Sequence, residues 1–156
     1  MSTEAHGGSD RALIRNDTLS HGTVECSDMV ATRRFLTDFL GLDIHRPVRE
    51  AQYMYRGGPW SVVCVQVDGG DAKDQSPDNH FKLSVDTREE VDAAHAAALA
   101  QRDRYGIKRV DDIREEDGAR AFRLQDLNYT WWEITTANQD HYAALFAAGD
   151  GAGMAA

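Results

Sequence analysis

The sequence predicts an α+β fold in which one unit, a strand followed by a helix and three further strands, occurs twice. The first observation behind this prediction is the order of the hydrophobic patterns, which alternate with a period of two in strands and of about 3.6 in helices. The second is a polar connector near the middle of the chain, which separates two halves with the same order of patterns. The third is the length of 156 residues, which is enough for one domain with a substantial hydrophobic core.

The first unit begins with a strand that carries His21, Thr23 and Glu25 on one face, because successive side chains of a strand alternate between faces. Asp28 is suited to cap the helix that follows, and Gly41 is suited to end it. The elements expected in this unit are a strand over 18–26, a helix over 29–40, and strands over 42–48, 52–55 and 60–67.

The second unit repeats this order after a connector at 68–78 that is rich in Gly, Asp, Ser and Pro. His80, Lys82 and Ser84 share one face of its first strand, and Thr87 with Glu90 forms a capping box at the start of its helix. The elements expected here are a strand over 80–85, a helix over 88–105, strands over 110–114, 119–124 and 129–135, and a short helix over 140–146.

These elements divide the chain into three parts. We expect one domain over residues 17–137, with a first module over about 17–68 and a second over about 79–137. The ends are rich in Gly, Ala and Ser, so we expect residues 1–16 to be a loose N-terminus and residues 138–156 a tail with a short helix.

The composition argues against several classes of function. A formal net charge of −9 is unsuited to nucleic-acid binding, which requires clustered Lys and Arg. No apolar run approaches the roughly 20 residues of a membrane span, and residues 1–17 lack the basic and then apolar pattern of an export signal. Cys26 and Cys64 fall in aliphatic segments, so we expect two buried, reduced thiols in a cytoplasmic protein.

Three side chains far apart in the sequence suggest a metal site. Glu133 lies among bulky apolar residues in the last strand of the second unit, where a carboxylate is costly to bury without a partner or a metal. His21 and His80 begin the first strands of the two units. Two imidazoles and one carboxylate bind divalent first-row metals such as Fe(II) and leave coordination positions open. Taken singly, each histidine is also explained by an ordinary polar position, and Glu133 by an edge strand that faces water.

The sequence resembles the vicinal oxygen chelate superfamily. The resemblance rests on the run from His21 to Asp28, the segment from Arg34 to Leu42, the strand that begins at His80, and the closing run from Phe122 to Glu133. It covers roughly residues 19–136. It implies paired βαβββ modules that form a U-shaped mixed sheet around a metal cavity, with helices on the outside, and a substrate bound to the metal through two oxygens.

The superfamily includes glyoxalase I, extradiol dioxygenases, fosfomycin-inactivating enzymes and metal-free antibiotic-binding proteins. All three ligand positions are filled here, and Cys64 stands near the position of a fourth ligand in glyoxalase I. The resemblance therefore implies an extradiol-type dioxygenase with Fe(II), for which Mn(II), Ni(II) or Zn(II) are alternatives, and with O₂ as co-substrate. A glyoxalase-like isomerase or lyase and a small-molecule-binding resistance protein stay open as alternative functions.

Other side chains of the same strand faces complete the candidate site. Arg123, Tyr129 and Lys82 are candidate catalytic groups, and the two cations are suited to an anionic substrate. Trp131, Thr23 and Cys64 are candidate substrate contacts. Short members of the superfamily often form homodimers, and some complete the metal site across the dimer. It therefore stays open whether His21 shares an ion with His80 and Glu133 of its own chain.

Overall fold

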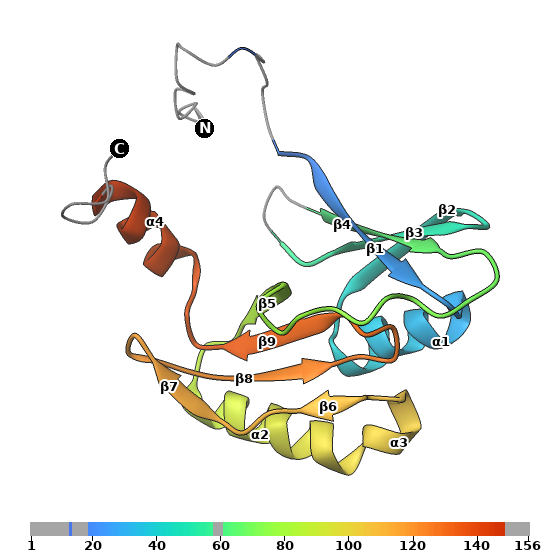
Figure 1. The fold of residues 1–156 in the computed structure, drawn as a ribbon. Helices are drawn as coiled ribbons and strands as arrows, with labels where there is room; N and C mark the ends of the chain where they lie inside the picture. Colours follow the sequence, from blue (N-terminus) through green and yellow to red (C-terminus); the bar gives the residue numbers. More distant parts are fainter. Residues whose placement is uncertain (1–12, 14–18, 58–60, 149–156) are drawn as a thin grey trace.

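The computed structural model describes residues 13, 19–57 and 61–148, which form two β-sheets with helices (Figure 1). The first sheet has the strand order β1-β4-β3-β2 and consists of β1 (His21–Cys26), β2 (Asp43–Val48), β3 (Ala51–Tyr55) and β4 (Ser61–Gln66). The second has the order β5-β9-β8-β6, with β7 paired to β8; it consists of β5 (His80–Ser84), β6 (Arg109–Val110), β7 (Arg114–Glu116), β8 (Ala119–Gln125) and β9 (Trp131–Thr135).

The two sheets repeat one pattern, as the sequence predicted. In each half the first strand pairs in parallel with the last, β1 with β4 and β5 with β9, and the remaining pairs are antiparallel. The α+β fold with two βαβββ units is therefore confirmed. Among the described strands no ladder joins the two sheets, so the expected U-shaped sheet is present as two separate halves, with β1 and β5 each at an edge.

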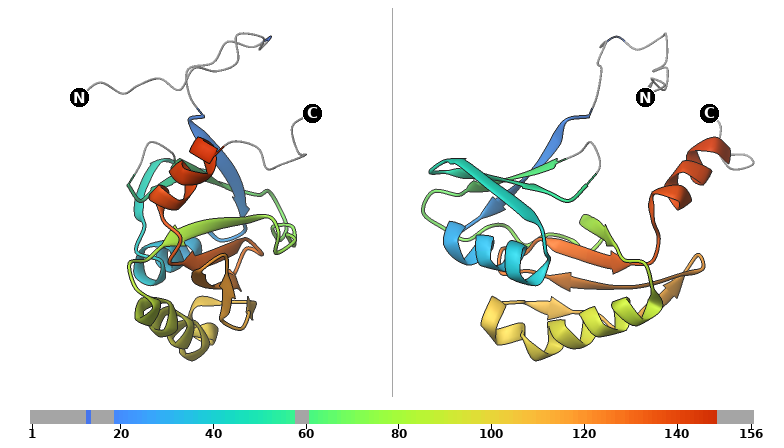
Figure 2. Two further views of the ribbon diagram at one scale, coloured as in Figure 1. Left: turned by 90° about the vertical axis from the view of Figure 1, so that its left-hand side faces the viewer. Right: turned by 180° about the vertical axis from the view of Figure 1, so that it is seen from behind.

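The helices lie outside the sheets. Helix α1 (Met29–Arg34) starts at the cap Asp28, which accepts hydrogen bonds from Val30 N and Ala31 N, both at 2.9 Å. It continues as a π-helical turn, η1 (Phe35–Phe39), within the segment predicted as one helix. Helices α2 (Arg88–Ala100) and α3 (Arg102–Tyr105) cover one face of the second sheet, and α4 (Gln139–Ala148) projects away from the body of the molecule (Figures 1 and 2).

Two strand predictions need correction. The segment predicted as a strand over 110–114 is divided between β6 and β7. The last strand begins only at Trp131, because Tyr129 has a φ of +62° and its N–H donates to Asp126 O at 3.1 Å. That turn takes Tyr129 out of the strand. The expectations for residues 1–12, 14–18 and 149–156 lie outside the described residues, and none of the described helices is both long and apolar enough to cross a membrane.

One hydrophobic core joins the two halves. Phe35 and Leu36 of the first half pack in the same buried cluster as Tyr105, Phe122 and Trp132 of the second. Burying such side chains contributes roughly 1.5–3 kcal/mol each. The halves are therefore held in a fixed relation to each other although their sheets are separate.

A polar contact at the turn before β9 adds to this connection. Asn128 Oδ1 accepts a hydrogen bond from Ser27 N at 3.1 Å, and its amide nitrogen donates to Thr32 Oγ1 at 2.9 Å. Ser27 lies in the corner between β1 and α1, and Thr32 lies within α1. The closing turn of the second module is thereby fixed to the first module.

Asp126 organises the same turn. It is buried, and its carboxylate accepts hydrogen bonds from Asn128 N at 2.8 Å, Thr130 N at 3.0 Å and Trp132 Nε1 at 2.9 Å. Burial raises the pKa of Asp126 to about 6, although these donors oppose the shift. The carboxylate is thus charged at neutral pH, and it is the acceptor for three N–H donors in the protein interior.

Replacing Asp126 with Ala should lower the free energy of unfolding by about 3 kcal/mol, because a buried donor left without an acceptor costs about 1–3 kcal/mol. Urea unfolding followed by tryptophan fluorescence measures the change. Asp112→Ala, at an exposed aspartate, is the control and should change stability by less than about 0.5 kcal/mol. Equal midpoints for the two variants would contradict this account of the turn.

Candidate metal centre

The register of the second sheet places three charged side chains in one row. Glu133 on the central strand β9 stands directly opposite Lys82 on β5 and Arg123 on β8. Directly opposed residues of neighbouring strands point to the same face and lie close enough to interact. The alternation along β8 predicted that Arg123 shares a face with Glu133, and the structure confirms this placement.

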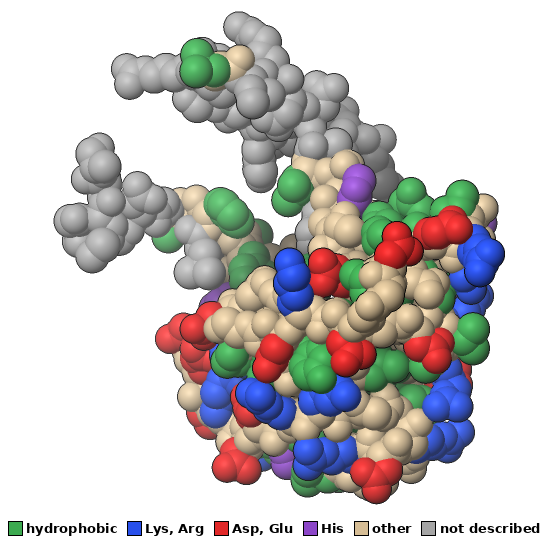
Figure 3. Space-filling view, turned by 45° about the vertical axis from the view of Figure 1, so that its right-hand side comes forward, with side chains coloured by type: hydrophobic (Ala, Val, Ile, Leu, Met, Phe, Trp, Pro, Cys, Tyr) green, Lys and Arg blue, Asp and Glu red, His purple; other side chains and the backbone are tan. Residues whose placement is uncertain are grey.

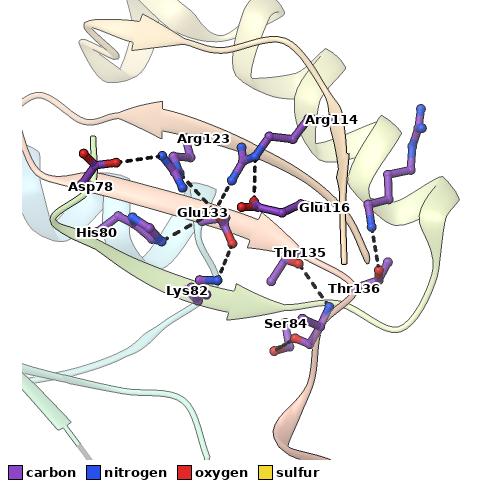
Figure 4. A network of polar contacts seen from close by, with 12 residues as sticks. Asp78, His80, Lys82, Ser84, Arg114, Glu116, Arg123, Glu133, Thr135 and Thr136 are labelled. Atoms are coloured by element: carbon purple, nitrogen blue, oxygen red, sulfur yellow. Dashed lines mark hydrogen bonds and ion pairs between the residues drawn. The ribbon is translucent and has the colours of Figure 1, made fainter. Parts of the chain in front are cut away.

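Glu133 is only 1% exposed, and three cations surround its carboxylate (Figure 4). Lys82 Nζ lies 3.0 Å from Oε1, and Arg123 Nε lies 3.0 Å from Oε2. Arg114 Nη2, from the short strand β7, also donates to Oε2. We call Lys82, Arg114 and Arg123 the cation cluster.

The cation cluster has more positive charge than the buried carboxylate neutralises. Its other acidic partners lie toward solvent. Glu116 is 3.1 Å from Arg114 Nε, and Asp78 is 3.8 Å from Arg123 Nη1. Both acids are more than half exposed, so water and salt screen their contribution. The centre is therefore a basic site on a chain whose overall charge is negative, and basic and acidic side chains are otherwise interspersed over the face drawn in Figure 3.

Two opposing effects set the ionisation of Glu133. Burial raises the pKa of its carboxyl group, but the hydrogen bonds and charges of Lys82, Arg123 and Arg114 outweigh that effect and hold the pKa below its ordinary value. Burial likewise lowers the pKa of Lys82, and Glu133 more than restores it, so the Lys82 pKa lies above its usual value. Both groups are charged at neutral pH.

His80 presents a nitrogen to the same carboxylate. Its Nδ1 lies 2.8 Å from Pro77 O, and because a carbonyl can only accept, this contact favours the tautomer with the proton on Nδ1. In that tautomer Nε2 would have a lone pair, and it lies 3.6 Å from Glu133 Oε2. Two lone-pair donors that converge in this way fit a shared cation, since ligands at right angles around an ion bound at about 2.1 Å stand about 3 Å apart.

His21 does not join this pair within the chain. It is exposed at the start of β1, where its Nδ1 lies 3.3 Å from Ser20 Oγ. In the part of the chain that the structure describes, no three His, Cys, Asp or Glu side chains lie close enough to hold one ion. The structure thus brings together two of the three predicted ligands and separates the third.

The remaining predicted residues lie in different surroundings. Thr23 lines a separate cavity of about 230 Å³, together with Glu25 and Asn79. Trp131 is buried, and its Nε1 donates to Gln75 O at 2.9 Å, so the connector covers it. Tyr129 lies in the turn before β9, under Lys108 Nζ at 5.0 Å from its ring centroid, and not in the strand that carries Glu133.

Cys64 requires a correction, because it lies in the hydrophobic core and is 1% exposed. It therefore does not contact a substrate from this position. Its pKa is raised by a hydrogen bond with Cys26 and by burial. Both cysteines are free, as expected of two buried thiols.

Arg114 is the member of the cation cluster that sequence reasoning missed. The sequence does contain the signal, because Asp117-Gly118 is a dipeptide typical of two-residue hairpin turns. Such a hairpin pairs Arg114 with Ala121, as the structure has it. Ala121 lies two residues from Arg123 on the same strand, so Arg114 must share the face of Arg123 and Glu133.

Comparison with known proteins identifies the fold. No protein-family model matches the sequence, and no curated protein is detectably similar to it. Among solved structures, the chain resembles the fosfomycin resistance protein FosX from Listeria monocytogenes, with 16% identity and a TM-score of 0.64 over 81% of this chain and 98% of that one. FosX from Mesorhizobium loti matches with 18% identity and a TM-score of 0.57, over 83% and 99% of the two chains. The oxidase ChaP-H2 matches with 22% identity and a TM-score of 0.57, over 78% and 94%.

These neighbours are vicinal oxygen chelate proteins, so the chain has the fold of that superfamily. The resemblance seen in the sequence is therefore confirmed at the level of the fold. At these identities the likeness establishes the arrangement of the elements and leaves the chemistry to be argued from the site.

Glu133→Gln should lower the free energy of unfolding by about 2–3 kcal/mol in metal-free buffer. Removing one partner of a fully buried ion pair costs about 3–5 kcal/mol, and the partial exposure of the cation cluster reduces that loss. Chemical denaturation in the presence of a chelator measures the effect. The matched control is Glu116→Gln, which also removes a partner of Arg114 but at the surface, and it should cost less than about 0.5 kcal/mol. If the two substitutions cost the same, the buried network is not the stabilising element described here.

Proposed function

We propose that the protein is a divalent-metal-dependent enzyme that acts on a small anionic molecule with two adjacent oxygen atoms. The observation that carries this proposal is the convergence of His80 Nε2 and Glu133 Oε2 on one space, with the cation cluster around it. Nitrogen and carboxylate ligands suit Fe(II) and Mn(II), and a site with few protein ligands leaves room for substrate.

The third ligand in this proposal is His21 of a second copy of the chain. His21 is exposed on the edge strand β1, while His80 lies on the edge strand β5 of the other sheet. A symmetric homodimer would place each His21 near the partner's His80 and Glu133 and would form two equal sites. This arrangement uses all three predicted ligands although one chain separates them.

The protein groups around the ion would bind and orient the substrate. When bound, a divalent ion lowers the pKa of a coordinated substrate hydroxyl and stabilises the oxyanion that forms. Arg114 and Arg123 offer planar donors that suit a carboxylate or phosphonate, and Lys82 offers a third positive charge. Glu133 is buried but the cation cluster is partly exposed, so water would screen these contacts in part.

The reaction we propose is oxygenation of a catecholic substrate that carries an anionic group, with Fe(II) and O₂. The fold likeness to the oxidase ChaP-H2 supports it. A second candidate is Mn(II)-dependent chemistry on a phosphonate. The cation cluster favours this candidate, and a FosX structure from L. monocytogenes contains Mn(II) and dihydroxypropylphosphonic acid, which is a vicinal diol with an anionic group.

Subunit complementation tests the shared metal site. His21→Ala and His80→Ala homodimers should both lose tight Mn(II) binding, whereas His45→Ala, at an exposed histidine of the first sheet, should retain it. Mixed after unfolding and refolding, the two defective chains should recover about a quarter of the sites, since about half of the dimers are mixed and each has one intact site. Electron paramagnetic resonance of free Mn(II) measures the recovery. No recovery from the mixture would refute a site shared between chains.

Oxygen consumption tests the reaction. Protein loaded anaerobically with Fe(II) should consume O₂ faster with a carboxylated catechol than with catechol itself. Arg123→Gln should raise KM for the carboxylated compound roughly 10- to 100-fold, because a hydrogen bond to a charged group is lost, and should change KM for catechol little. Arg120→Gln is the control, because Arg120 pairs with Asp92 and Glu115 on the other side of the sheet. Absence of O₂ uptake, together with loss of fosfomycin in phosphorus NMR with Mn(II), would favour the second candidate.

A further inference from the structure

The cation cluster and a metal ion would compete for the lone pairs of the Glu133 carboxylate. Its two oxygens offer about four acceptor sites. Lys82 occupies Oε1, and Arg114 and Arg123 both occupy Oε2, the oxygen that faces His80 Nε2. An ion shared with His80 must therefore take the oxygen on which two arginines already converge.

Electrostatic repulsion between the cation cluster and a metal ion adds to this competition. A divalent cation placed beside the buried Glu133 would add two positive charges to a site that already has three positive, partly exposed side chains and one negative one. These charges would repel the ion, although the partial exposure of the cation cluster screens the repulsion in part. Glu116 and Asp78 lie toward solvent and offset this repulsion only in part.

We propose that the cation cluster acts as a latch on Glu133, so that an anion releases the carboxylate for the metal and the two ligands bind with positive cooperativity. This inference rests on the proposed function, because it concerns the same metal site. An anion that accepts hydrogen bonds from Arg114, Arg123 and Lys82 supplies the acceptors that these side chains otherwise find on Glu133. It also neutralises the charge that repels the metal.

Cooperativity of this kind is reciprocal, because each ligand must change the affinity of the other by the same factor. Without ligands, the site would rest with Glu133 paired to the cation cluster. Binding of the anion would convert the site to a state that binds metal. Arg114 is the residue best placed to act as the latch. It comes from the short hairpin strand β7, whereas Lys82 and Arg123 are fixed opposite Glu133 by the register of the central strands.

Mn(II) affinity measured with and without methylphosphonate tests the latch. Wild-type dimer should bind Mn(II) about 5- to 150-fold more tightly when methylphosphonate is saturating. Calorimetric titration of methylphosphonate in the presence and absence of Mn(II) should give the same factor. Direct coordination of the anion to the metal would also produce such coupling, so a variant must separate the two explanations.

Arg114→Gln provides that separation in buffer without an added anion. If Arg114 competes for Glu133, this variant should bind Mn(II) more tightly than the wild type and should show weaker coupling to methylphosphonate. Arg120→Gln lies on the same hairpin but pairs with Asp92 and Glu115, and it should behave as the wild type. Thermal unfolding of each variant confirms that it is folded.

The possible outcomes are distinct. Mn(II) binding that is equal with and without methylphosphonate, or an Arg114→Gln variant that binds Mn(II) no more tightly than the wild type, would overturn the latch and leave the metal site standing. Absence of Mn(II) binding in every condition would overturn the metal site and the latch together. Tighter anion-free binding by Arg114→Gln, with the control unchanged, would support both.

Discussion

The buried negative charge of Glu133 is the constraint around which the second half of the molecule is arranged. A carboxylate with 1% exposure is tolerable only where neighbouring groups replace the hydration that it loses. The strand register provides two of these groups, one on either side, and the β7–β8 hairpin provides the third. Any substitution that disturbs this register would therefore also disturb the charge balance of the centre.

A second constraint fixes the two halves to each other and explains where His21 lies. The end of β1 is held at the closing turn of the second module through Ser27 and Asn128. His21 is at the opposite end of that strand, and a six-residue strand is roughly 20 Å long. The contact that joins the modules thus carries one predicted ligand away from the other two.

Much of the fold could be predicted from the sequence because local signals and periodicity agreed. The caps at Asp28 and Thr87, the alternation along β5 and the aromatic and β-branched residues of β9 indicated the elements, and the repeated order indicated the architecture. The turn at Tyr129 was not predictable from strand propensity, since the residue is aromatic and its positive φ is set by the hydrogen bonds of Asp126. The π-helical turn η1 was not predicted either; the rings of Phe35 and Phe39 stack there with centroids 5.4 Å apart.

The sequence predicted which side chains share a face of the second sheet, but it did not predict the distances between side chains on different sheets. Strand parity placed Lys82, Arg123 and Glu133 together, because parity depends only on sequence spacing within each strand. It could not exclude His21, because the relation between two sheets depends on long-range packing and not on local pattern.

The same separation of the predicted ligands is the reason for the homodimer in the proposed function. One chain holds His21 on one sheet and His80 with Glu133 on the other, and β1 and β5 are each terminal strands of their sheets. Edge strands tend to be covered in proteins. A two-fold axis would bring the first half of each chain to the second half of the other. In the proposed dimer His21 and Glu133 would need no contact within one chain, where ion pairs stabilise Glu133. In the proposed homodimer the cation cluster would compensate the buried charge of Glu133 until the metal and the partner's His21 bind.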